Sequence, residues 1–200
     1  MSIVVHGTSS SGNCHKVRMV LDITGQPYEW REIDIMKAQT RTPEFLRLNA
    51  NGKVPVVVLE DGSTLPESNA ILWYFGEGTA LVPADRLARA RMLQWMFFEQ
   101  YSHEPAIAVA RFIRVFHRRP DDPRLPDLLA RGHRALSVME QHLADHDYFG
   151  GDALSLADLA LFAYTHAAAD GGYDLASYPS VRDWLARCLG NRGVSVMPAP

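Results

Sequence analysis

Patterns typical of β-strands occur in the first third of this sequence and nowhere after it. Short apolar or alternating runs bounded by turn residues are found at residues 3–5, 28–33, 53–59 and 64–66. From Arg86 onward, apolar residues recur at helical spacing instead. A passage rich in Gly and Pro, residues 76–85, separates the two regions, as in an interdomain linker. We therefore predict an α+β domain over residues 1–76, a linker over 77–85 and an all-helical domain over 86–200.

Three helices are expected among these strands, which gives the N-terminal domain the order β-α-β-α-β-β-α. The first runs to Thr24 and ends before Gly25. The second is short and has Pro43 at its first position, and the third opens at Glu67. Pro55 cannot donate a ladder hydrogen bond, so it must stand at the very start of its strand.

Four helices are predicted for the C-terminal domain. A long one runs from Arg86 toward Phe116 with a kink at Pro105. The next covers residues 125–143, and the last covers about 179–189. Between them, Ser155 and Asp158 have the spacing of a capping box before an apolar run, which indicates a buried central helix in which Asp158 has a structural role. The tail from Asn191 is expected to be irregular.

Composition and charge exclude several classes of function. The 200 residues carry a formal net charge of -3 with scattered basic residues, which argues against a nucleic-acid partner. No apolar segment approaches the length of a membrane span, and no secretory signal precedes the first strand, so we expect a cytoplasmic protein without membrane contact. Cys14 and Cys188 are the only cysteines, and the histidines show no metal-ligand spacing, so neither a disulfide nor a metal is expected.

The loop over residues 8–17 carries several hydroxyls where a strand leads into a helix. The N-terminus of a helix stabilises negative charge through free N–H groups and aligned peptide dipoles. We therefore predict an anion site at this loop.

Four short motifs, taken in order, resemble those of the glutathione S-transferase family. They are Ser11-Gly12-Asn13-Cys14, Val54-Pro55, Glu67-Ser68 and Ser155-Leu156-Ala157-Asp158. Together they cover nearly the whole chain, and they look like those of serine-type bacterial members similar to the theta, zeta or nu classes. The resemblance implies a thioredoxin-like N-terminal domain, a helical-bundle C-terminal domain and a cytosolic homodimer. It also implies glutathione as co-substrate and a small hydrophobic electrophile as its reaction partner.

The resemblance also implies roles for individual residues. Ser11 is expected to stabilise the glutathione thiolate, with the Asn13 amide as an alternative donor. Lowering a thiol pKa from about 8.5 to about 6.5 requires roughly 2.7 kcal/mol, which one hydroxyl donor and a helix N-terminus can supply. The remaining contacts to the tripeptide are assigned to the backbone of Val54 beside a cis Val54–Pro55 bond, to Glu67 and Ser68 at the γ-glutamyl end, and to Lys53 with Lys37 or Gln39 at the glycyl carboxylate.

Other interpretations remain open from the sequence. Ser11-Gly12-Asn13-Cys14 resembles a Cys-x-x-Cys motif without its reactive first cysteine, so Cys14 is expected to be a packed, inert residue. Tyr101 and Arg111 are candidates for the electrophile pocket, because the resemblance places that pocket along the long helix. A non-catalytic glutathione-binding module, a glutathione-dependent isomerase or a disulfide reductase would share the same first domain.

Overall fold

A single four-stranded sheet forms the centre of the N-terminal region in the computed structural model, which describes residues 2–199. Its strand order is β2-β1-β3-β4, and the strands are β1 (Ile3–Gly7), β2 (Tyr28–Glu32), β3 (Val56–Val58) and β4 (Thr64–Pro66). The pairing of β1 is parallel with β2 and antiparallel with β3, and β3 pairs antiparallel with β4. The Val54–Pro55 bond is cis, and β3 begins directly after it.

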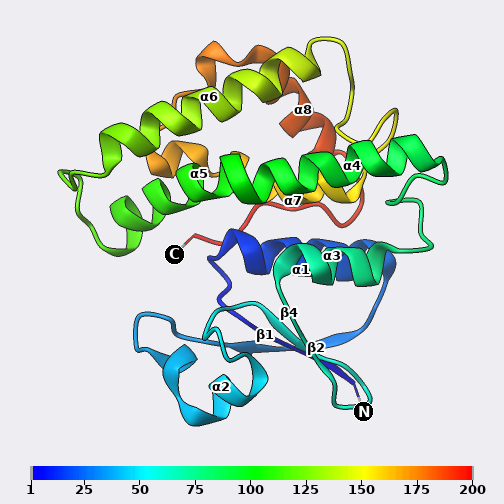
Figure 1. Ribbon diagram of the computed structural model, residues 1–200, viewed down its shortest axis with the longest axis vertical. Coiled ribbons are helices and arrows are strands. Elements are labelled where there is room, and N and C mark those ends of the chain that lie inside the picture. The colour runs from blue at the N-terminus through cyan, green and yellow to red at the C-terminus, as the bar shows by residue number, and fades with distance from the viewer. Residues whose placement is uncertain (1, 200) are drawn as a thin grey trace.

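Three helices cover this sheet, and the whole unit has the predicted thioredoxin-like order. Two of them, α1 (Gly12–Thr24) and α3 (Ser68–Gly76), lie between the sheet and the helical bundle (Figure 1). The short α2 (Pro43–Leu48) lies on the other side of the sheet. Thr42 caps α2 by accepting a hydrogen bond from the Phe45 N–H, and Pro43 holds the first helical position.

The rest of the chain is helical, as predicted. The main helices are α4 (Arg86–Phe98), α5 (Glu104–Arg111), α6 (Leu125–Leu143), α7 (Leu156–Thr165) and α8 (Pro179–Leu189). Short 3-10 turns occur at η1 (Gln39–Arg41), η4 (Ala168–Gly171) and η5 (Leu175–Ser177). None of the helices described over residues 2–199 is long and apolar enough to cross a membrane.

The long helix predicted from Arg86 is divided by two π-helical turns, η2 (Glu99–His103) and η3 (Phe112–Phe116). Pro105 explains the first turn. Proline has no N–H to donate, and its ring clashes with the carbonyl four residues earlier. The backbone therefore widens before Pro105, and the Glu104 N–H bonds to the Glu99 carbonyl five residues back.

Helix α7 is the core of the bundle, since all ten of its residues are buried. Its first turn is organised by the buried carboxylate of Asp158. That carboxylate accepts hydrogen bonds from the Ser155 N–H (2.9 Å) and hydroxyl (2.6 Å), the Phe149 N–H (2.9 Å) and the Trp184 indole N–H (2.9 Å). The structural role predicted for Asp158 is confirmed by these contacts.

Residues 191–199 contain no helix or strand, in agreement with the predicted irregular tail. Figure 1 shows this tail running between α1 and the helical bundle. The Ser195 carbonyl accepts a hydrogen bond from His15 Nε2 of α1 (2.6 Å), and the Met197 N–H donates to His166 Nε2 (3.1 Å). The tail is therefore packed against both parts of the chain.

Candidate functional site

A small polar cavity of about 110 Å³ lies where the first turns of α1 and α3 meet the junction of α4 and α5. Nine residues line it, namely Asn13, Asn49, Lys53, Val54, Pro55, Glu67, Ser68, Gln100 and Glu104. Six of the nine are residues that the sequence predicts for glutathione: Asn13, Lys53, Val54, Pro55, Glu67 and Ser68. The fold brings them together from three separate loops and helix starts.

Ser11 is the N-cap residue of α1 and is half-buried, two residues before Asn13. Its side chain makes no capping hydrogen bond. The neighbouring hydroxyls are occupied, since Thr8 Oγ1 donates to the Ile33 carbonyl (2.6 Å) and Ser9 Oγ donates to the Glu32 carboxylate (2.6 Å). The Ser11 hydroxyl contacts the Cys14 thiol, and Ser11 is not among the nine residues that line the cavity.

Three other predicted residues lie away from the cavity. The Lys37 side chain is 78% exposed and pairs with Asp34 at 3.3 Å. Gln39 accepts a hydrogen bond from the Asp34 N–H (2.7 Å). Tyr101 is 85% exposed and lines a separate hollow with residues of α6 such as Val138.

Arg111 is buried and holds the opening loop from the helical side. Its Nη1 donates to the Ser10 carbonyl (3.0 Å), and its Nε donates to the Asp170 carboxylate (3.0 Å). The sequence resemblance predicts contact between Arg111 and an electrophile. The structure places its guanidinium against the backbone directly before Ser11.

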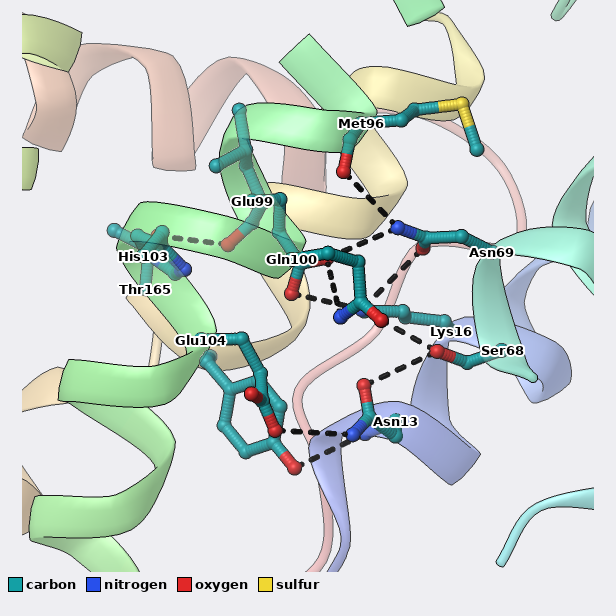
Figure 2. A network of polar contacts seen from close by, with 12 residues as sticks. Asn13, Lys16, Ser68, Asn69, Met96, Glu99, Gln100, His103, Glu104 and Thr165 are labelled. Atoms are coloured by element: carbon teal, nitrogen blue, oxygen red, sulfur yellow. Dashed lines mark hydrogen bonds and ion pairs between the residues drawn. The ribbon is translucent and has the colours of Figure 1, made fainter.

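The Asn13 side chain is fixed by partners from two other helices. Ser68 Oγ donates to Asn13 Oδ1 (3.1 Å), and Asn13 Nδ2 donates to Glu104 Oε1 (3.3 Å), as Figure 2 shows. The Asn13 N–H also donates to the Tyr164 hydroxyl (3.3 Å). The first turn of α1 is therefore closed by residues of the helical bundle.

A buried ion pair lies behind Ser68. The Lys16 ammonium is 2.8 Å from Glu99 Oε1, and neither side chain is exposed. Lys16 Nζ also lies 3.4 Å from Ser68 Oγ and from Asn69 Oδ1, while Asn69 Nδ2 donates to Glu99 Oε2 (3.1 Å) (Figure 2). Ser68 thus links the cavity to a buried cation.

Sequence reasoning did not find the other three lining residues, Asn49, Gln100 and Glu104. Gln100 and Glu104 lie on the helical side of the cavity, and neither belongs to a recognisable motif. An acid beside a proline at the start of a helical segment, as at Glu104–Pro105, is ordinary helix-start chemistry. Burial raises the pKa of the Glu104 carboxyl, and the nearby Lys16 ammonium opposes that shift.

Cys14 is fully buried behind the opening loop, with its sulfur accepting from the Thr8 N–H (3.4 Å). Burial raises the pKa of its thiol to about 11, although contacts with the Ser11 hydroxyl and the Thr8 N–H act in the other direction. A thiol in this state carries almost no thiolate near pH 7, in agreement with the expected inert role. Residues 2–199 contain no cluster of three or more His, Cys, Asp or Glu side chains that could hold a metal.

The cavity lining contains acidic, basic and hydroxyl side chains. Glu67 and Ser68 stand at the start of α3, where a ligand with an ammonium and a carboxylate can be held. The β3 ladder begins at Val56, so the Val54 backbone stays outside the sheet pairing and is free to pair with an extended peptide. Lys53 supplies a cation at the other side.

Comparisons with known proteins agree with this arrangement. Residues 10–77 match the family model for the N-terminal domain of glutathione S-transferases, and residues 122–187 match the model for the C-terminal domain. The disulfide-bond oxidoreductase YfcG of Escherichia coli is 31% identical over 88% of this chain and 85% of its own length.

Solved structures are similar over almost the full chain. A glutathione S-transferase from Xanthobacter autotrophicus is 49% identical with a TM-score of 0.95, covering 98% of this chain and 97% of that one. A glutathione transferase from Burkholderia graminis, solved with two glutathione molecules per subunit, is 28% identical with a TM-score of 0.82. The match covers 96% of this chain and 85% of the Burkholderia graminis chain.

Proposed function

Because the chain belongs to the glutathione S-transferase family, we propose that it is a cytoplasmic glutathione transferase that forms a homodimer. It binds glutathione in the cavity between α1, α3 and α5, stabilises the thiol as a thiolate and adds it to a small hydrophobic electrophile. The observation that carries this proposal is the convergence of Asn13, Val54, Glu67 and Ser68 on one polar cavity.

Each side chain has a part of the tripeptide to bind. Glu67 holds the γ-glutamyl ammonium, and Ser68 holds the adjoining carboxylate through its hydroxyl and N–H. The Val54 backbone pairs with the cysteinyl backbone as an added strand would. Lys53 binds the glycyl carboxylate, a role in which Lys37 is less suitable because it is exposed and paired with Asp34.

Ser11 is the favoured partner of the thiolate. Its hydroxyl is not used for capping, whereas both ends of the Asn13 amide already have partners. One hydrogen bond to a charged acceptor is worth about 1.5–3 kcal/mol, and the start of α1 adds roughly 0.3–2 kcal/mol. Together these cover the roughly 2.7 kcal/mol that lowers a thiol pKa by two units.

The test is a pH titration of the ultraviolet thiolate absorbance of bound glutathione. In the wild type we expect a thiol pKa of about 6.5, and in Ser11→Ala a return toward the free value of about 8.5. Asn13→Ala is the comparison for the alternative donor. A wild-type value equal to that of free glutathione would overturn the proposed activation and would favour a non-catalytic binding module.

Disulfide reduction is the second candidate, because a 31% identical relative is named a disulfide-bond oxidoreductase. The same thiolate would attack a small disulfide and release one thiolate. A second glutathione would then resolve the mixed disulfide, giving glutathione disulfide and the second reduced product. Rates of product formation with a chloronitrobenzene and with a small disulfide, measured side by side, separate the two reactions. A protein that only catalysed isomerisation would form neither the glutathione conjugate of the chloronitrobenzene nor the reduced products of the disulfide.

A further inference from the structure

The side chain of Tyr164 packs against the first turn of α1, although Tyr164 belongs to α7 in the helical bundle. It is buried, and its ring occupies the space that Gly12 leaves open. A Cβ added at Gly12 would stand 2.6 Å from two carbon atoms of that ring. The Tyr164 hydroxyl accepts a hydrogen bond from the Asn13 N–H (3.3 Å). Tyr164 is therefore fixed at the helix start that Ser11 caps.

The Tyr164 hydroxyl keeps a proton that it can donate. A phenol hydroxyl carries one proton and can also accept, and the accepting role is taken here by the Asn13 N–H. Burial raises the pKa of Tyr164, and the Glu104 carboxylate and the Cys14 thiol act in the same direction, so the hydroxyl stays protonated near pH 7. The oxygen in contact with it is that of the Ser11 hydroxyl.

The Ser11 backbone is fixed, so its hydroxyl is the part that can turn. The Ser11 N–H donates to the Thr8 carbonyl (2.9 Å), and the Ser11 carbonyl accepts from the His15 N–H (2.8 Å). The hydroxyl contacts both the Cys14 thiol and the Tyr164 hydroxyl. A serine hydroxyl has two lone pairs and one proton. When Ser11 Oγ accepts from a neighbour through a lone pair, its own proton is left for a ligand.

We propose that Tyr164 is a positioning residue for thiol activation, whose hydroxyl donates to Ser11 Oγ and thereby directs the Ser11 proton toward the glutathione sulfur. This inference rests on the proposed function, since it concerns the same thiolate. A hydroxyl that accepts a hydrogen bond becomes a stronger donor, because the two bonds polarise each other. Tyr164 keeps its proton throughout and acts only through Ser11. The helical domain thus takes part in activation without touching the sulfur.

The test is a pH titration of the thiolate absorbance of bound glutathione in four proteins: the wild type, Tyr164→Phe, Ser11→Ala and the double variant. Tyr164→Phe should raise the thiol pKa by about 0.4 to 1, the effect of losing one neutral hydrogen bond. In the Ser11→Ala background it should cause no further rise, because the residue through which it acts is gone. Glutathione affinity at about pH 5, where the thiol is protonated, should match that of the wild type.

Tyr173→Phe is the matched control. Tyr173 is also a buried tyrosine of the helical region, and its hydroxyl donates to the Leu128 carbonyl (2.8 Å), away from the cavity. Its loss should lower the thermal stability and leave the thiol pKa of bound glutathione unchanged. A purely structural effect of removing a buried hydroxyl is thereby separated from an effect on the thiolate.

Two results would overturn the inference. One is a thiol pKa that Tyr164→Phe leaves unchanged. The other is an equal rise with and without Ser11, which would assign the effect to the Asn13 N–H. The proposed function fails separately, because in that case the wild-type thiol pKa already equals that of free glutathione.

A second variant keeps the hydroxyl and tests the inference even where Tyr164→Phe does not fold. Tyr164→fluorotyrosine, with the fluorine beside the hydroxyl, makes the phenol more acidic and a stronger donor. We expect it to lower the thiol pKa of bound glutathione below the wild-type value. An unchanged or raised value in the folded protein contradicts donation from Tyr164 to Ser11.

Discussion

The ammonium of Lys16 and the carboxylate of Glu99 lie 2.8 Å apart with both side chains fully buried. Lys16 belongs to α1 and Glu99 to the η2 turn before α5, so the pair joins the two parts of the chain. Each charge has lost its water, and each depends on the other for compensation. The pair also lies against Ser68, on the wall of the cavity.

Breaking this pair on one side should destabilise the protein strongly. Lys16→Met leaves the Glu99 carboxylate buried without its cation, and such a loss costs about 3–5 kcal/mol. Adding Glu99→Leu removes the stranded charge and should recover much of that loss. Urea denaturation of both variants measures the two effects.

Lys37→Met is the matched control for Lys16→Met. Lys37 also pairs with an acid, Asp34 at 3.3 Å, but its side chain is 78% exposed. An exposed pair contributes about 0–1 kcal/mol, so this variant should unfold nearly as the wild type does. Equal stability of the two methionine variants would contradict the importance of the buried pair.

The protein should lose stability as the pH is lowered, because of His15. Burial lowers the pKa of His15 to about 4 from its ordinary 6.5, while its hydrogen bond to Ser195 opposes the shift. Between these two values the unfolded chain binds a proton that the folded chain does not, so stability is lost as pH falls from 6.5 toward 4. His15→Gln removes this titration. Each protein loses some free energy of unfolding when the pH is lowered from 7.5 to about 5. That loss should be about 2 kcal/mol smaller in His15→Gln than in the wild type.

An exposed side chain that carries no ionisable group serves as the comparison. Gln141 lies at the surface of α6, and Gln141→Ala should keep the full pH dependence of the wild type. The experiment is urea denaturation at both pH values for the three proteins. Identical pH dependence in wild type and His15→Gln would show that His15 is not buried in its neutral form.

Most helices and strands follow from local sequence signals. Helices α6 and α8 match the ranges predicted from apolar periodicity, and Gly25 ends α1 in a left-handed conformation. The strand after Pro55 is shorter than its apolar run, residues 53–59, because pairing begins only at Val56. These features depend on neighbours in the sequence, which is why periodicity and capping rules detect them.

The helical side of the site depends on contacts that no local pattern encodes. The π-turn η2 adds a residue to the helical period, and one residue corresponds to about 100° of rotation. The face that each later residue presents therefore cannot be derived from spacing alone. Tyr101, in that turn, is 85% exposed, while Glu104 faces the cavity.

Arg111 should affect both stability and activity, because it holds the loop that carries Ser11. Its guanidinium reaches both the Ser10 carbonyl and the Asp170 carboxylate at 3.0 Å, a double contact that the single ammonium of Arg111→Lys cannot reproduce. We expect a loss of about 1–3 kcal/mol in stability and roughly 10-fold in kcat/KM, since the loop carries Ser11. Urea denaturation and steady-state kinetics measure the two. Arg187→Lys, at a partly exposed pair with Asp147, should change neither, and a fully active Arg111→Lys would rule out the loop-holding role.

Cys14 should be dispensable for any thiol chemistry at this site. Its sulfur is fully buried, and burial raises the pKa of the thiol to about 11, so the thiolate is a very small fraction near pH 7. Cys14→Ala should therefore keep kcat/KM within about 3-fold of the wild type, for both conjugation and disulfide reduction, since 3-fold corresponds to under about 1 kcal/mol. Iodoacetamide should modify neither Cys14 nor the buried Cys188 in the folded protein, and should modify both in urea. If Cys14→Ala lost disulfide reduction but kept conjugation, the reductase reaction would run through a protein thiol, and glutathione alone could not account for it.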